Sequence, residues 1–391
     1  MIDRRAAKGF PMPERIKRAV LRAIRATGYT IVRLPDIHST APGRGSTAAL
    51  VGAARPPAID SKELLWAESR TSTADHFAEV DKLLNAITPW CGEVPDGYVV
   101  DFLGILRDGK FLWNQTGPCG GQYVSTSLPT VATDGEGWFE VADWLISAHE
   151  ARQQYVAVSL GASFGYQLVG AWKALQAVNP LPARLVAVEP VPQNCDWIRR
   201  HMATNGINPD DHWIIQAALG HDNEPVLFPV GAPGTGLQNS HVVNATESRQ
   251  SYAEALRRQG QCERVLESIL LYNSTGIMRE LGHGYSGELK LVSAVTLRDV
   301  LAPLDRIDLL EVDIQQSEIE VIPPCMEIVD RKVRRIHVGT HGREAHDLLR
   351  ALFSRAKWEI VFDYAPNSRH VTERGSMDLG DGILTARNPA V

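Results

Sequence analysis

The sequence is poor in cysteine and lacks the spacings that build disulfide frameworks or zinc ribbons. Its five cysteines are scattered over 391 residues, and no two of them form a C-x-x-C pair. Disulfide-stapled secreted domains and structural zinc sites need such pairs, so both classes are disfavoured. No apolar run reaches the length of a membrane span, and the start lacks a signal-peptide core. These absences favour a cytoplasmic protein in a reducing compartment.

The chain as a whole also lacks an excess of positive charge. Its net charge is −6, which argues against nucleic acid as a partner. Basic residues gather in the first 33 residues, where residues 14–28 have the apolar spacing of a helix. We therefore expect a basic amphipathic helix region over residues 1–38. It either packs on the main domain or lies at a membrane surface, and its short apolar stripe without Trp or Phe favours packing.

Composition and patterning divide the rest of the chain into three parts. Residues 39–60 are rich in Gly, Ala, Pro, Ser and Thr, as in a linker. Residues 61–150 mix predicted helices and short strands and carry no chemical motif, so they are expected to form an α+β extension. Residues 151–391 form the predicted main domain, with an insertion at about 231–294 that we expect to shape a substrate pocket.

The main domain alternates strands with helices, which predicts an α/β fold with a doubly wound parallel sheet. Helical spacing lies between most of these strands, notably over residues 193–204 and 344–356. The expected strands are residues 155–161, 183–190, 212–219, 306–314, 332–341, 358–364 and 382–388. Ligands of such folds bind beyond the carboxyl ends of the parallel strands.

The first of these strands ends in a glycine turn, S-L-G-A-S-F-G, from Ser159 to Gly165. Gly161 and Gly165 allow a tight strand-to-helix turn, and a cofactor can then approach bare backbone beside Ser159 and Ser163. The spacing is G-x-x-x-G instead of G-x-G-x-x-G, and no pyrophosphate loop is evident. A nicotinamide oxidoreductase is therefore disfavoured relative to an enzyme whose cofactor carries no phosphate.

The second and third strands supply the remaining cofactor candidates. The second strand ends in Glu189, an acid that can accept hydrogen bonds from both ribose hydroxyls of an adenosine. Gln216 and Ala217 end the third strand and are expected to flank the adenine. The glycine turn, the acid and the β-α-β spacing together indicate an adenosine cofactor.

Polar residues follow two later strands and are expected to meet at the same edge of the sheet. Asp313 and His341 are the predicted catalytic pair, with Gln315, Glu318 and His337 as substrate contacts. A histidine near neutral pKa can remove a hydroxyl proton. A carboxylate can orient that histidine, bind the hydroxyl or hold a divalent metal, and the sequence leaves these roles open. His337 is alternatively a hydrogen-bonded core histidine.

Taken together, these motifs resemble the FkbM-type methyltransferase family. The resemblance rests on three motifs, Ser159 to Gly165, Glu189-Pro190 and Asp313 to Glu318, and on VTLRDVL, IHVGTH and DGILTARNP at residues 295–301, 336–341 and 381–389. It implies a Rossmann-like class I methyltransferase sheet and S-adenosylmethionine as cofactor. It also implies O-methylation of a small-molecule or glycan acceptor, such as a sugar, lipid or secondary metabolite.

The chain departs from the family pattern at two positions. Ser159 stands where the family usually has Asp or Glu, an acid that engages the amino-acid end of the cofactor, and Gln316 stands where glycine is usual. These departures motivate an alternative hypothesis, a catalytically inactive methyltransferase fold that binds or regulates. The sequence leaves metal use and assembly into a homo-oligomer open.

Overall fold

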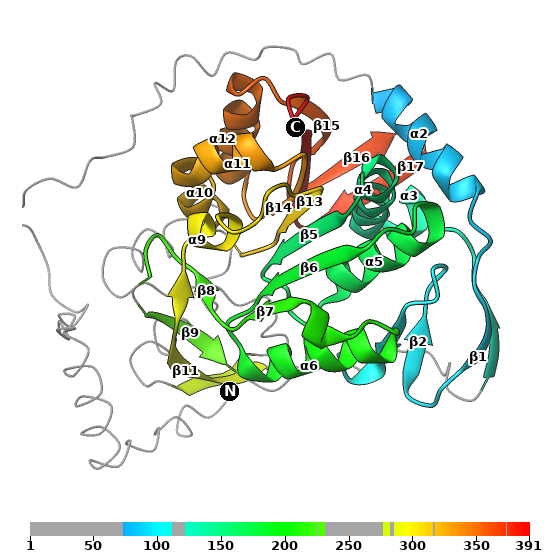
Figure 1. The fold of residues 1–391 in the computed structure, drawn as a ribbon, viewed down its shortest axis with the longest axis horizontal. Helices are drawn as coiled ribbons and strands as arrows, with labels where there is room; N and C mark the ends of the chain where they lie inside the picture. Colours follow the sequence, from blue (N-terminus) through cyan, green and yellow to red (C-terminus); the bar gives the residue numbers. More distant parts are fainter. Residues whose placement is uncertain are drawn as a thin grey trace, which may run out of the picture. The chain divides into compact units, whose positions relative to one another are not determined.

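A mixed sheet of seven strands lies at the centre of the computed structural model (Figure 1). The structure describes residues 73–111, 122–223, 225–230, 277–281, 285–315, 317–372 and 374–391. All of these belong to the unit Asp60–Val391. The expected basic helix, the linker, most of the insertion and Gln316 lie outside the described residues.

The strand order in this sheet is β15-β18-β14-β13-β5-β6-β7. Neighbouring strands run parallel except at β18, which is antiparallel to both β14 and β15. The strands are β5 (Tyr155–Leu160), β6 (Ala183–Val188), β7 (Trp213–Ile215), β13 (Leu309–Val312), β14 (Arg335–Thr340), β15 (Glu359–Tyr364) and β18 (Gly382–Arg387). This arrangement confirms the predicted doubly wound α/β fold.

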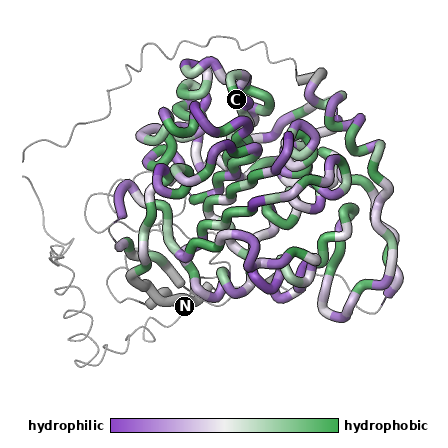
Figure 2. The backbone as a smooth tube through the Cα atoms, viewed as in Figure 1, coloured by the Kyte–Doolittle hydropathy of each residue, from purple (hydrophilic) through white to green (hydrophobic). Residues whose placement is uncertain are grey.

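Helices cover both faces of the sheet because both sides of each central strand are apolar. Tyr155 and Ala157 of β5 join α4 and α5 in one core, whereas Val156 and Val158 join α9, α11 and α12 in the other. The hydrophobic strands and the mixed outer helices are visible in Figure 2. The covering helices are α4 (Glu136–Glu150), α5 (Tyr166–Val178), α6 (Pro192–Thr204), α9 (Leu297–Leu301), α10 (Glu318–Val321), α11 (Met326–Lys332) and α12 (Arg343–Arg355).

The part that precedes β5 shares a core with the sheet. Phe77 of α2 (Thr73–Asn85) contacts Trp138 of α4, with ring centroids 5.1 Å apart, and Phe139 contacts Phe362 of β15 at 4.9 Å. One hydrophobic core thus spans both sides of the expected boundary at residue 150. The other elements here are β1 (Cys91–Val94), β2 (Tyr98–Val100), β3 (Leu106–Asp108), β4 (Gln122–Ser125) and α3 (Val131–Asp134).

The expected third strand over residues 212–219 is wrong as a single strand. It breaks after β7, and the next strand, β8 (Ala218–Leu219), leaves the main sheet to pair with β12 (Ala294–Val295). The described residues of the expected insertion form mainly β-structure. An antiparallel sheet joins β9 (Val226–Val230), β10 (Ile277–Leu281) and β11 (Tyr285–Val292), and a hairpin joins β16 (Ser368–Thr372) and β17 (Gly375–Leu379).

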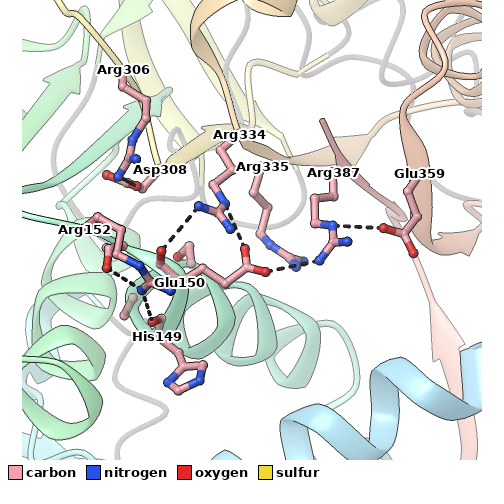
Figure 3. A network of polar contacts seen from close by, with 12 residues as sticks. His149, Glu150, Arg152, Arg306, Asp308, Arg334, Arg335, Glu359 and Arg387 are labelled. Carbon is pink, nitrogen blue, oxygen red and sulfur yellow. Dashed lines mark hydrogen bonds and ion pairs between the residues drawn. The ribbon is translucent and has the colours of Figure 1, made fainter. Parts of the chain in front are cut away.

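Ion pairs fix α4 in place along the sheet (Figure 3). Glu150, the last residue of α4, pairs with Arg334 at 3.1 Å and with Arg387 at 3.2 Å. Arg334 precedes β14 and Arg387 ends the antiparallel β18, so both lie at the amino edge of the parallel strands. Helix α4 is therefore antiparallel to these strands, and its first turn lies at their carboxyl ends.

Candidate active site

The glycine turn after β5 brings two strand ends into backbone contact. Gly161 has φ +78°, and a Cβ atom there would lie 1.9 Å from the carbonyl oxygen of Asp313. Gly165, with φ +81°, caps the start of α5. The predicted turn therefore exists, and glycine at position 161 joins the cofactor loop to the end of β13 without a steric clash.

Glu189 ties the end of β6 to this turn. Its carboxylate accepts hydrogen bonds from the backbone N–H groups of Ser163 and Val191, each at 2.9 Å, and from the side chain of Asn194 at 3.1 Å. Burial raises the pKa of Glu189 to about 7, although these hydrogen bonds lower it. Glu189 and Ser163 thus form one hydrogen-bonded unit at the edge where an adenosine is expected.

The other cofactor candidates surround that unit. Ser163 has φ +49°, and no described residue hydrogen-bonds its buried hydroxyl oxygen. Gln216 is exposed and Ala217 is buried, and both lie where the chain leaves β7 for β8. Ser159 is buried in β5, two residues before Gly161. Because the strand breaks after β7, the predicted adenine contacts Gln216 and Ala217 lie directly after the last strand of the sheet.

At the neighbouring strand ends, His341 lies between two carboxylates. Its Nδ1 atom is 2.9 Å from Oε1 of Glu318, and its Nε2 atom is 3.3 Å from Oδ1 of Asp313. Asp381, just before β18, lies 3.8 Å from the same Nε2 atom. Gln315 donates a hydrogen bond of 3.0 Å from its side chain to Asp313. Sequence reasoning placed four of these five residues together, and the structure adds Asp381.

The carboxylates decide the charge of His341. Burial lowers its pKa, but hydrogen bonds to Asp313 and Glu318 and their negative charges raise it well above the usual value. Burial conversely raises the pKa of Asp313, and the hydrogen bond and charge of His341 outweigh this effect and lower it. His341 is therefore an imidazolium at neutral pH in this arrangement, whereas the side chain of Asp313, 52% exposed, keeps its negative charge.

The first turn of α4 adds acidic residues that sequence reasoning missed. The helix begins at Glu136, and the side chain of Glu136 reaches the site. A Cβ atom on Gly339 of β14 would lie 3.9 Å from both Glu136 Oε1 and Asp313 Oδ1. Burial, together with the charges of Glu140, Asp381 and Asp313, raises the pKa of Glu136 to about 8. The site is therefore rich in carboxyl groups, and the raised pKa means that Glu136 holds a proton at neutral pH.

His337 lies beneath this edge, two residues before Gly339 along β14. Its Nδ1 atom is 2.7 Å from Asp143 of α4, and Thr385 donates a hydrogen bond of 2.7 Å to the same carboxylate oxygen. Asp143 also pairs with the buried Arg335 at 2.8 Å. The predicted substrate contact at His337 thus corresponds to a buried histidine whose ring is hydrogen-bonded to α4.

Comparison with known proteins identifies the class of this site. Residues 171–357 match the methyltransferase FkbM domain. The chain is also 25% identical over 299 residues to a putative methyltransferase of Jannaschia sp. (strain CCS1), which covers 75% of this chain and 94% of the relative. These two matches confirm the resemblance of the motifs to the FkbM-type methyltransferase family. A domain of this family implies S-adenosylmethionine as the methyl donor.

Two solved structures of methyltransferases show remote similarity to this chain. The methyltransferase FkbM of Methylobacillus flagellatus KT aligns with a TM-score of 0.34 and 14% identity, covering 61% of this chain and less than half (45%) of that one. The precorrin-6y C5,15-methyltransferase of Geobacter metallireducens GS-15 aligns with a TM-score of 0.32 and 11% identity, covering 66% of this chain and 93% of that one.

Within the described part of the chain, no helix is long and apolar enough to cross a membrane. No three described His, Cys, Asp or Glu side chains group as metal ligands.

Proposed function

We propose that the protein is an S-adenosylmethionine-dependent O-methyltransferase whose acceptor is a hydroxyl of a sugar, lipid or secondary metabolite. One observation supports this proposal most directly: the backbone of Gly161 contacts that of Asp313, so the turn expected to bind the cofactor lies beside the His341–Asp313 pair. A methyl donor in the turn and an acceptor at the pair would therefore be neighbours. Such positioning supplies much of the rate of an in-line displacement.

The residues at the carboxyl edge fit the cofactor chemically. Gly161 and Gly165 provide the positive φ angles of the turn, Glu189 can accept from ribose hydroxyls, and the buried hydroxyl of Ser163 has no described partner. Gln216 and Ala217, where the chain leaves β7 for β8, are the proposed adenine contacts. When bound, S-adenosylmethionine supplies an electrophilic methyl group on a sulfonium.

On the acceptor side, Asp313 is the group that faces a hydroxyl. Its half-exposed carboxylate can accept the hydroxyl hydrogen bond, while Gln315 and the His341 imidazolium hold its orientation. The acceptor oxygen becomes strongly acidic as its bond to the methyl carbon forms. A carboxylate can therefore take the proton and pass it to solvent, without a free imidazole as base. This assigns His341 the task of positioning Asp313 and stabilising its charge.

Replacing His341 tests this assignment. We expect His341→Ala to lower turnover by about 100-fold, as when a catalytic group loses the residue that positions it, and to leave cofactor affinity unchanged. The measurement is methyl transfer to a panel of hydroxyl acceptors, with S-adenosylhomocysteine binding by calorimetry. His370→Ala, outside the site, is the matched control. Near-normal turnover of His341→Ala would refute this role of His341. If wild-type protein binds the cofactor tightly but transfers no methyl group to any acceptor, the catalytically inactive alternative is favoured.

Glu189 is expected to control cofactor affinity and its pH dependence. Because burial raises its pKa to about 7, its carboxylate is protonated below that pH and cannot accept from both ribose hydroxyls. Affinity for methylthioadenosine, which keeps the ribose but lacks the amino-acid end, should rise from pH 6 to pH 8. Glu189→Gln should flatten this profile, and Glu189→Ala should weaken binding by about 10-fold or more. A flat wild-type profile would contradict the role, and tight NADH binding would favour the oxidoreductase hypothesis.

A further inference from the structure

Glu311 lies beside Ser159, one of the positions at which the chain departs from the family pattern. The two residues are register partners on the adjacent parallel strands β13 and β5. Side chains at paired positions of parallel strands project from the same face, and neighbouring strands lie only about 4.8 Å apart. A carboxylate at position 311 is therefore one strand away from the place where the family usually carries its acid.

The carboxylate of Glu311 is buried and only half satisfied. Its Oε1 atom accepts a hydrogen bond of 2.8 Å from the indole N–H of Trp144, but no described residue donates to Oε2. The residue is 5% exposed. A buried carboxylate oxygen without a donor is destabilising, so its retention beside the cofactor turn points to a donor that a ligand brings.

The charges around Glu311 favour a cation. Glu140 and Asp143 of α4 face it, as do His337 of β14 and the phenol of Tyr155 on β5. The next positions outward on the same face of β5 and β13 are Gly161 and Asp313, which border the proposed cofactor site. A positively charged group that enters past Gly161 therefore approaches the carboxylate of Glu311 from the ligand side.

We propose that Glu311 replaces the acid missing at position 159, so that its Oε2 atom accepts a hydrogen bond from the α-ammonium group of the cofactor. This inference rests on the proposed function, since it assigns a residue to the same cofactor. Ser159 then leaves room beside the carboxylate instead of weakening the site. In this chain the acid that the family carries on the strand equivalent to β5 is thus supplied by the neighbouring strand β13.

Proton release gives a readout that a merely structural role would not change. Burial and the charge of Glu140 raise the pKa of Glu311 to about 8, so this acidic pair holds a proton at neutral pH. An ammonium group that hydrogen-bonds Glu311 lowers that pKa and displaces the proton. Calorimetry of wild-type protein at pH 7, in buffers of different ionisation enthalpy, should detect proton release with S-adenosylhomocysteine. Release should be smaller with the analogue that lacks the amino group.

The test compares these two ligands on three forms of the full-length protein. Wild type should bind the des-amino analogue about 10- to 100-fold more weakly than S-adenosylhomocysteine, as expected for a hydrogen bond between charged groups. Glu311→Gln keeps an oxygen for Trp144 and should bind the two ligands with nearly equal affinity. Adding Ser159→Asp to Glu311→Gln should restore the preference for the amino group, because the carboxylate returns to the neighbouring strand.

The outcomes separate this inference from the proposed function. If wild type binds S-adenosylhomocysteine and Glu311→Gln keeps the full preference for its amino group, the inference is wrong and the cofactor assignment stands. If wild type binds neither S-adenosylhomocysteine nor methylthioadenosine, both are wrong. Unchanged unfolding midpoints of Glu311→Gln in urea would show that any loss of affinity is local.

Discussion

Replacing Gly161 with alanine should unfold or severely destabilise the protein and abolish cofactor binding. A Cβ atom at this position would lie 1.9 Å from the carbonyl oxygen of Asp313, a backbone atom that cannot move without separating β5 from β13. The left-handed φ of +78° adds a conformational penalty. We expect a loss of about 4 kcal/mol or more in the free energy of unfolding, as in other severe steric substitutions.

Gly206 provides a matched control for this substitution. It has a similar φ of +81°, but a Cβ atom there would have no neighbour within 4 Å. Gly206→Ala should therefore show the backbone penalty alone, about 1 kcal/mol, and should leave cofactor binding intact. Urea unfolding and S-adenosylhomocysteine calorimetry on both variants check the prediction. Equal effects of the two substitutions would show that close approach to Asp313 is unimportant.

A second large effect is expected at Asp143, the fully buried acid of α4. Asp143→Ala would leave the buried guanidinium of Arg335 and the ring of His337 without their carboxylate. Removing one partner of a buried ion pair typically costs about 3–5 kcal/mol. Burial lowers the pKa of His337, but Asp143, with Glu311 and Glu140, raises it to about 9.

The pH dependence of this effect has a definite sign. A histidine whose pKa is raised on folding adds stability below its unfolded pKa of about 6.5, and this stability is lost as pH rises through about 9. The destabilisation by Asp143→Ala should therefore be larger at pH 6 than at pH 10. Urea unfolding at pH 6 and pH 10 measures this destabilisation.

Asp378→Ala, which breaks an exposed pair with Arg369, is the control and should change stability little. The double variant Asp143→Leu with Arg335→Met should recover part of the stability lost in Asp143→Ala. Equal stability of Asp143→Ala and wild type at pH 6 would contradict the prediction.

The sheet was predictable because its strands are long apolar runs that alternate with helices. Strands β5, β6, β13, β14, β15 and β18 all lie within expected ranges. The third strand failed for a tertiary reason: an apolar run continues past Gln216, but β12 offers β8 a partner outside the main sheet. Pairing between segments about 75 residues apart leaves no local pattern, so residue spacing could not reveal it.

The site was predictable only where it follows parallel strands. The positions of Gly161, Glu189, Asp313 and His341 follow from the rule that the carboxyl ends of parallel strands share an edge. Glu136 could not be found this way, because it comes from a helix that precedes the first strand of the sheet. Asp381 did leave a signal: it precedes the last expected strand, but the antiparallel direction of that strand had to be known.

The position of β5 determines which part of this chain can exist by itself. The segment that matches the family, residues 171–357, begins after β5 and ends before β15 and β18. A fragment cut at those limits would keep β6 and β7 on one side and β13 and β14 on the other, without the strand that joins them. It would also lack Trp144, whose indole N–H donates a hydrogen bond to Glu311 of β13. Residues 171–357 are thus not expected to fold by themselves. The smallest fragment that we expect to fold extends from α2 to the end of β18.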